Sequence, residues 1–253
     1  MIRNATDRRP RSIQGNPVHA VDGELGSITD VFFDDHAWTV RYLVVYLEGG
    51  LDGQEALITP GSVSDADRQS RSLYVDTNRE RVREAPHIGA NLPVAARQEA
   101  VYHEYLGTDP YWIQDPAPVA PVQPIQPPGI EPGEGAARAG GDPHLRSAQE
   151  VVGYHVETAD GSVGHVEDLL LDDEAWRVRY IVVDTRNWLP AKKVLVPPDC
   201  VSGMEWSLQR ILVDLNSQEI KDAPAWDPDA PMDRRYETRL HEHYGQAPYW
   251  VYE

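Results

Sequence analysis

Two twelve-residue stretches of this chain are nearly the same, and they constrain its fold more than any other feature. The first covers residues 34–45 and the second covers residues 172–183. Each begins with two adjacent acids, which favour a turn, and continues into aromatic and β-branched residues, which favour a strand. Each stretch therefore predicts the turn and the second strand of a β-hairpin.

The similarity extends well beyond these stretches. One fixed shift aligns Gly15 with Gly153, Trp38 with Trp176 and Trp112 with Trp250 without a gap. Many aligned pairs are identical and most others are conservative. The period is too long for a solenoid repeat, so we interpret the chain as a tandem duplication of a whole domain.

Each copy is predicted to consist mostly of β-strands. Asp22-Gly23 and Asp160-Gly161 are strong turn signals. Many short strands joined by tight turns predict a small closed β-barrel, followed by a short helix. The expected strands are residues 13–18, 26–33, 38–46, 56–59 and 72–75, and then 151–156, 164–171, 176–184, 194–196 and 211–213; the expected helices are 78–84 and 216–222.

The hairpins also predict charge pairs and a core. If the acidic turn is tight, Asp30 lies opposite Arg41 and Asp168 lies opposite Arg179, which predicts a cross-strand ion pair in each copy. A one-residue bulge would instead separate the charges and leave them solvated. The core is expected to contain Trp38, Val40, Tyr42, Val44, Trp176, Val178, Tyr180 and Val182.

A helix and an aromatic tail are predicted after each barrel. Residues 97–107 and 235–245 have apolar residues at helical spacing and end at a glycine. A Pro-Tyr-Trp sequence follows each, and it supplies the predicted anchors Tyr111 and Trp112, and Tyr249 and Trp250. Each tail is expected to pack on its own barrel or on that of the other copy.

A segment rich in proline, glycine and alanine separates the copies and predicts a linker that is first semi-rigid and then flexible. We expect domains at residues 1–113 and 145–253, with the linker at 114–144. The barrels are expected to form an intramolecular pseudo-dimer with an approximate twofold, or to be loosely tethered, and a homo-oligomer is also left open.

The composition limits the partners. A net charge of −18 over 253 residues argues against direct binding of nucleic acid or anionic lipid. The basic residues are nearly all arginines, with lysine only at 192, 193 and 221. This bias fits a GC-rich genome, and the abundant carboxylates fit a salt-rich cytoplasm; the two interpretations are compatible. The single cysteine, Cys200, the absence of a long apolar run and an N-terminus unlike a signal peptide lead us to expect a cytoplasmic protein without a membrane span.

Residues 148–156, 160–173 and the strand after them resemble the PRC-barrel domain, and the first copy resembles it more loosely through residues 22–26, 34–35 and 40–45. In that family this small β-barrel forms the cytoplasmic part of the photosynthetic reaction-centre H subunit and the C-terminal half of a ribosome-maturation factor. The resemblance implies a mainly β chain of two tandem PRC-like barrels, each followed by a short helix and an aromatic tail. It brings no catalytic motif and implies a binding or assembly module.

Few residues suggest chemistry. His155 and His165 are expected to approach one another near Glu167, and His241-Glu242 lacks the second histidine of a metalloprotease motif. We expect no catalytic residue, no cofactor and no metal.

We therefore expect a non-enzymatic binding or scaffolding protein with an unknown protein partner, and the acidic surface suggests stress or salt adaptation. The alternatives are an assembly factor at a membrane complex, like the reaction-centre subunit, and a metal-binding protein or enzyme that uses His155, His165 and Glu167. The candidate interaction or structural residues are Asp30, Arg41, Trp38, Tyr111, Trp112, Asp168, Arg179, Trp176, Tyr249 and Trp250.

Overall fold

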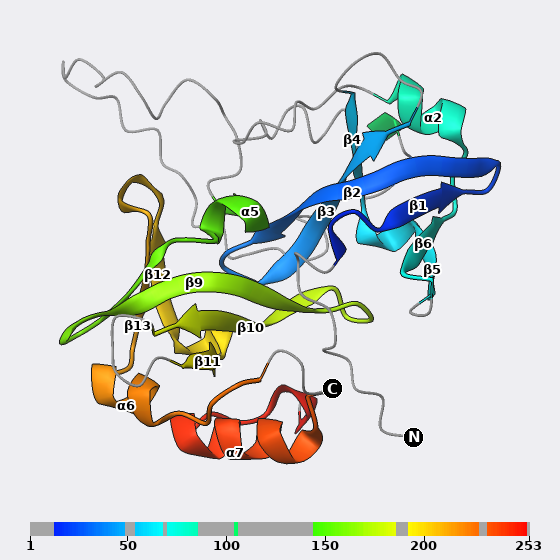
Figure 1. Cartoon of the computed structure of the whole chain (residues 1–253). Coiled ribbons are helices and arrows are strands. Elements are labelled where there is room, and N and C mark those ends of the chain that lie inside the picture. Colours follow the sequence, from blue (N-terminus) through cyan, green and yellow to red (C-terminus); the bar gives the residue numbers. More distant parts are fainter. Residues whose placement is uncertain are drawn as a thin grey trace, which may run out of the picture.

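The computed structural model describes residues 13–48, 54–67, 70–85, 104–105, 144–185, 192–227 and 232–251 (Figure 1). Linker residues 114–143 and the predicted anchors Tyr111 and Trp112 lie outside these ranges. The elements of the first repeat are β1 (Pro17–Ala20), β2 (Gly23–Asp34), β3 (Thr39–Leu47), β4 (Glu55–Ile58), the 3₁₀ turn η1 (Pro60–Ser62), β5 (Val63–Asp67), β6 (Ser72–Val75) and α2 (Arg79–Glu84).

The second repeat has the same succession of six strands, preceded by a short strand and a short helix, and it then continues into a longer helix. Its elements are β7 (Leu145–Ser147), α5 (Ala148–Val151), β8 (His155–Thr158), β9 (Gly161–Asp172), β10 (Arg177–Asp184), β11 (Lys193–Val196), η2 (Pro198–Cys200), β12 (Val201–Glu205), η3 (Trp206–Leu208), β13 (Arg210–Val213), α6 (Ser217–Asp222), α7 (Arg234–Tyr244) and η4 (Tyr249–Val251). In Figure 1, α7 lies beneath the strands β10 and β11.

Both repeats have the same strand order. The first runs β5-β6-β1-β2-β3-β4 and the second runs β12-β13-β8-β9-β10-β11. Neighbouring strands are antiparallel, except that β1 pairs with β6, and β8 with β13, in parallel. The predicted mainly β class is confirmed, although the described strands do not close into a single barrel.

Most predicted strands are present, but the first strand of each repeat was placed too early and three of the described strands were not predicted. Residues 13–15 and 151–153 each form the end of a helix followed by a turn, with positive φ at Gly15 and Gly153, so the predicted strand start was wrong. Strand β5 (Val-Ser-Asp-Ala-Asp) and its equivalent β12 (Val-Ser-Gly-Met-Glu) were missed because their sequences give no clear strand signal. The three-residue strand β7 was missed as well.

The two repeats are joined by a reciprocal backbone contact. Val40 N–H donates to the carbonyl of Trp176 at 2.7 Å, and Val178 N–H donates to the carbonyl of Trp38 at 2.8 Å. These are equivalent positions, so β3 and β10 meet as the two halves of a twofold interface would. The sheet and the main hydrophobic core run through both repeats.

One strand of the second repeat also pairs with the sheet of the first repeat. Strand β7 pairs with the end of β2, where Arg146 lies opposite Phe33. Ser147 Oγ donates to Asp30 Oδ2 at 2.5 Å, and the backbone N–H of Gln149 donates to Asp30 Oδ1 at 3.1 Å. The repeats are therefore interlocked rather than loosely tethered.

Candidate functional site

The turn of each hairpin is built around the first acid of the Asp-Asp pair. Asp172 Oδ1 accepts the backbone N–H groups of Glu174 and Ala175, and its Oδ2 accepts Nε and Nη2 of Arg179 at 3.0 and 2.7 Å. Asp34 makes the same turn, and its Oδ2 accepts Nη2 of Arg41 at 2.8 Å. A single carboxylate thus closes the turn and holds the arginine of the following strand.

The predicted alignment of Asp30 opposite Arg41, and of Asp168 opposite Arg179, is wrong. A bulge between Phe32 and Phe33 shifts the register of β2 and β3, so Asp30 lies opposite Val44 and Arg41 reaches Asp34. The bulge between Val178 and Tyr180 likewise places Asp168 opposite Val182, and Arg179 reaches Asp172. Asp30 instead accepts hydrogen bonds from Ser147 and Gln149 of the second repeat. Burial raises the pKa of Asp30.

Trp38 and Trp176 end the turns in the left-handed region, with φ of +54° and +52°. This conformation costs a non-glycine residue about 1–2 kcal/mol, and both tryptophan carbonyls accept the bonds that join the repeats. Their side chains differ. Trp38 is buried and stacks on Phe33 with ring centroids 5.5 Å apart, whereas Trp176 has Leu171 in the equivalent place and stays half-exposed. The prediction that Trp176 is a core residue was therefore only partly correct.

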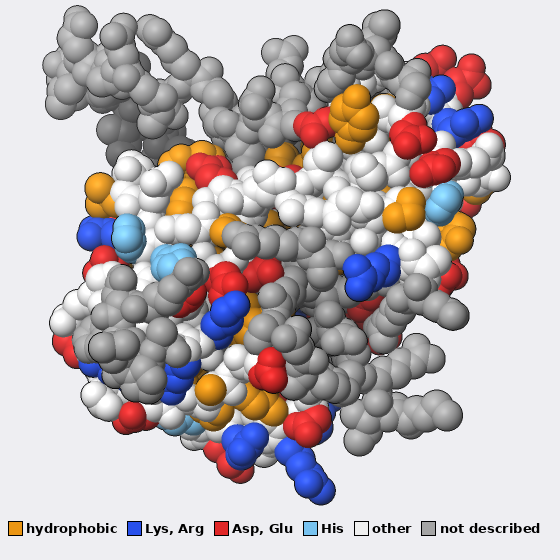
Figure 2. Space-filling model, in the orientation of Figure 1, with side chains coloured by type: hydrophobic (Ala, Val, Ile, Leu, Met, Phe, Trp, Pro, Cys, Tyr) orange, Lys and Arg blue, Asp and Glu red, His pale blue; other side chains and the backbone are white. Residues whose placement is uncertain are grey.

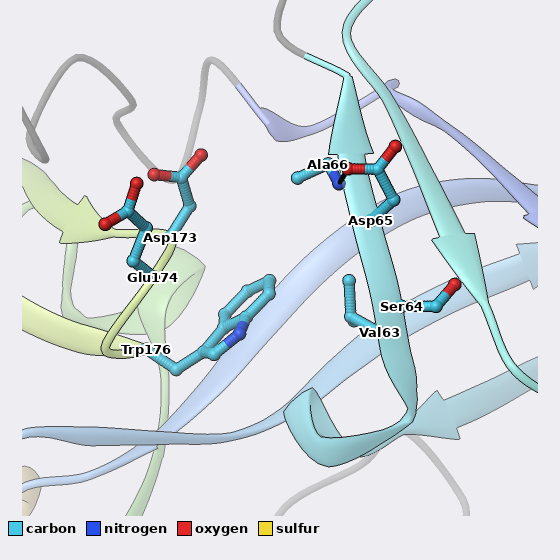
Figure 3. A pocket seen from close by; sticks show the side chains of 7 residues that line it. All are labelled: Val63, Ser64, Asp65, Ala66, Asp173, Glu174 and Trp176. Atoms are coloured by element: carbon cyan, nitrogen blue, oxygen red, sulfur yellow. Dashed lines mark hydrogen bonds between the residues drawn. The ribbon is translucent and has the colours of Figure 1, made fainter. Parts of the chain in front are cut away.

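The exposed edge of Trp176 lines a pocket of about 500 Å³ between the repeats. Strand β5 contributes Val63 to Ala66, and the β9–β10 turn contributes Asp173, Glu174 and Trp176. Figure 3 shows the indole pointing from this turn toward Val63, with the carboxylates of the turn on one side and that of Asp65 on the other. We call these seven lining residues the acidic pocket.

The first repeat shows what the turn next to the acidic pocket is able to hold. Asp35, the equivalent of Asp173, has Arg146 Nε at 2.8 Å and His144 Nδ1 at 2.9 Å. The Arg146 guanidinium also lies over the ring of Trp206, 5.0 Å from its centroid. At this turn an arginine on an extended strand is held by a carboxylate and an aromatic ring. Sequence reasoning treated Asp35 and Asp173 as ordinary turn residues, because nothing in the sequence shows that β7 or β5 reaches them.

A second cluster holds the C-terminal helix on the second repeat. Tyr180 of β10 donates to Glu237 Oε1 at 3.1 Å and lies 3.0 Å from His241 Nε2. Tyr249 donates to the same Glu237 oxygen at 3.1 Å. Tyr180, Glu237 and His241 are all buried, and burial raises the pKa of Glu237. The sequence repeats these residues in the first copy as Tyr42, Glu99, His103 and Tyr111.

The second tail packs against side chains of the second repeat. The guanidinium of Arg179 lies 3.9 Å from the ring centroid of Tyr249, and that of Arg234 lies 3.9 Å from that of Trp250. Trp250 also meets His241 edge-on at 5.3 Å. This tail packs on its own repeat, so the interlocking of the repeats comes from β7 and not from the tail.

Truncation after Gly245 is expected to lower the melting temperature. It removes the Tyr249–Glu237 hydrogen bond and both cation–π contacts, which together are worth about 2 kcal/mol. For a chain of this length that corresponds to roughly 4–8 °C in Tm, measured by circular dichroism. The matched control is the single substitution Val251→Ser, which changes an exposed residue of the same tail. An unchanged melting curve on truncation would mean that the tail contributes nothing.

Stability is expected to fall as the pH drops from 7.5 to 5.5, in part because of His241. Burial lowers the pKa of His241, with a smaller contribution from Arg234, while Asp199 opposes it. The unfolded chain therefore takes up a proton near pH 6.5 that the folded chain resists, and the stability present above that pH is lost below it. The unfolding free energies of the wild type and of His241→Gln are measured at several pH values between 7.5 and 5.5. Glu237, whose pKa is raised, contributes in the opposite direction in both proteins, so the difference between them isolates the contribution of His241. A constant difference would contradict it.

The metal or enzyme alternative depends on His155, His165 and Glu167. His155 and His165 are cross-strand partners on β8 and β9, but Glu167 bonds to Lys193 Nζ at 2.6 Å. Burial raises the pKa of the Cys200 thiol to about 12, which keeps it protonated. Within the described ranges no group of three or more histidine, cysteine or acidic side chains is arranged to hold a metal ion.

The surface is mixed. On the face shown in Figure 2, hydrophobic side chains are scattered among acidic and basic ones. Among the described residues no helix has the length and apolar character needed to cross a membrane.

The fold and the acidic pocket define a duplicated small-barrel module with a recessed site between its repeats. A family model of the PRC-barrel domain matches the chain twice, at residues 6–82 and 143–218. These matches cover more than half of the chain, and the chain belongs to the PRC-barrel domain family as a tandem duplication. Comparison with curated protein sequences finds no match.

Proposed function

We propose that this chain is a non-enzymatic binding protein that holds a basic protein partner in the acidic pocket between its repeats. The observation that carries the proposal is the pair of equivalent turns. In the first repeat the turn holds Arg146 on strand β7, and in the second the equivalent turn and strand β5 together line a pocket that the half-exposed Trp176 indole faces.

The chemistry of the pocket suits an arginine on an extended segment. Asp65, Asp173 and Glu174 provide negative charge, and the Trp176 indole offers a face for a cation. Residues 170–172 of β9 correspond to residues 32–34 of β2, where β7 adds as a strand. The partner segment would therefore add to β9 in the same way, with its arginine in the pocket.

The net charge of −18 supports a basic partner and disfavours nucleic acid. It also supports a setting in salt or stress adaptation. If the chain acts at a membrane complex, as the reaction-centre subunit does, this proposal has it bind a protein of that complex through the same acidic pocket.

The test is titration of the full chain with the peptide His-Leu-Arg-Ser-Ala-Gln, the sequence of residues 144–149, followed by calorimetry and tryptophan fluorescence at low salt. We expect 1:1 binding that weakens at least tenfold when the peptide arginine is replaced by alanine. The chain variant Asp173→Asn/Glu174→Gln should weaken binding similarly, whereas Glu80→Gln, an exposed acid on α2, should not.

A second experiment distinguishes an external partner from the chain's own N-terminal residues as the occupant of the pocket. Arg8 stands at the position of Arg146 in the repeat alignment, so the full-length variant Arg8→Ala is titrated in parallel. Binding to the wild type supports an external partner. Binding that appears only in Arg8→Ala would overturn the proposal in favour of the chain's own N-terminal residues. No binding to either chain would reject the pocket as a peptide site.

A further inference from the structure

A different pocket, of about 340 Å³, lies where the first repeat meets the C-terminal part of the second. We call it the histidine pocket. Four segments of the chain line it: the turn at residues 36–38, strand β10, the segment at residues 197–199, and the helix α7 with its tail. This volume is at the lower end of the range for small-molecule sites. None of the residues of the acidic pocket lines it.

The histidine pocket has one polar atom that the fold leaves unused. His241 lines the pocket and is only 3% exposed, and its Nδ1 has no hydrogen-bond partner among the described residues. Buried polar atoms are nearly always paired, because leaving one unpaired costs its full desolvation. Among the described residues nothing pairs with this nitrogen, so it is available to a hydrogen-bond partner that enters the pocket.

The neighbours of His241 determine what Nδ1 is able to do. Glu237 Oε1 lies 3.1 Å from the Tyr180 hydroxyl and, as a carboxylate, takes its proton in a hydrogen bond. His241 Nε2, 3.0 Å from the same hydroxyl, must then carry the hydrogen and donate it. In the neutral ring this leaves Nδ1 as a bare acceptor, so its missing partner is a donor.

The rest of the pocket combines a cation with apolar walls. Arg177 is exposed, and its Nη2 donates to the carbonyl of Ala37 at 3.2 Å, which holds the guanidinium at the pocket. His36 lies at the same edge, and Asp199 is the acid that lines the pocket. Trp38, the two prolines at 197 and 198 and the Tyr249 ring offer flat apolar surface.

We propose that the histidine pocket binds a small aromatic acid that donates a hydrogen bond to His241 Nδ1 and places its carboxylate at Arg177. A flat ring fits between the aromatic and proline walls, an O–H or N–H at one end satisfies the buried nitrogen, and the acid at the other end meets the guanidinium. This binding is separate from that of the basic partner, so either proposal stands or fails alone.

The probe is 4-hydroxybenzoate, titrated into the full chain and followed by calorimetry and by the ¹⁵N chemical shift of His241 Nδ1. We expect 1:1 binding with a shift of that nitrogen. Benzoate lacks the donor and 4-hydroxybenzyl alcohol lacks the acid, and each should bind about tenfold more weakly.

The variants test the same two contacts. His241→Gln keeps a donor toward Tyr180 but removes the Nδ1 acceptor, and Arg177→Gln removes the cation; each should weaken 4-hydroxybenzoate about tenfold. Asp65→Asn, in the acidic pocket, should leave it unchanged. Absence of binding to the wild type at 10 mM probe, on the order of the weakest fragment affinities, would overturn the proposal. Equal affinity for 4-hydroxybenzoate and benzoate would also overturn it, and this comparison needs no variant to fold.

Discussion

Replacing Gly164 by alanine is expected to destabilise the chain by about 3–5 kcal/mol. An added Cβ would lie 2.2 Å from the carbonyl oxygen of Asp184 and 3.0 Å from its carbonyl carbon. Both atoms are backbone of β10, the strand paired with β9, so no side-chain rotation relieves the clash. The equivalent Gly26 would meet the carbonyl of Tyr46 in the same way. Chemical denaturation of Gly164→Ala measures the loss.

Gly203→Ala is the matched control in the same repeat. Its added Cβ would meet only the Leu212 side chain at 3.7 Å, an ordinary contact, and its φ lies outside the left-handed region. We expect its denaturation midpoint to stay close to that of the wild type. If both variants lost the same stability, the close approach of β9 to β10 would not be the cause.

Replacing Arg179 by leucine is expected to cost about 3–5 kcal/mol, the usual cost of breaking a buried ion pair. The side chains of Arg179 and Asp172 are 6% and 4% exposed, so the substitution leaves a carboxylate in the interior without its cation. It also removes the cation from beneath Tyr249. Thermal and chemical unfolding should both show the loss.

Arg210→Gln serves as the exposed comparison, because Arg210 pairs with Glu205 at the surface. Solvent screens such a pair, and its Tm should remain near that of the wild type. The double variant Asp172→Asn/Arg179→Leu should recover part of the stability lost by Arg179→Leu, because the buried carboxylate charge is gone. Failure to recover any of it would mean that the packing on Tyr249, and not the ion pair, determines the loss.

The hairpins were predictable because their signals are local. The acidic turn and the β-branched run after it lie within a few residues of one another, and the same pattern occurs twice. The partner of Arg179 was mispredicted for a local reason as well. A one-residue bulge shifts the register, and nothing in residues 168–179 distinguishes a bulged strand from a regular one.

The candidate sites depended on contacts that the sequence does not mark. Arg146 reaches Asp35 across more than one hundred residues, and Trp176 faces β5 of the other repeat. The buried His241 was recognisable as part of an amphipathic helix, but its unpaired Nδ1 follows from the packing of Tyr180 and Glu237. Contacts between residues so far apart leave no periodic pattern in the sequence, so they could not be predicted from it.

The most direct measurement of the central claim is a charge exchange across the acidic pocket. The wild type and Asp173→Arg are each titrated with the arginine peptide and with the same peptide carrying glutamate in place of arginine. The proposed binding function predicts at least a tenfold preference of the wild type for the arginine peptide, and a reversed preference in Asp173→Arg. An unchanged order of the two peptides in the variant would contradict it.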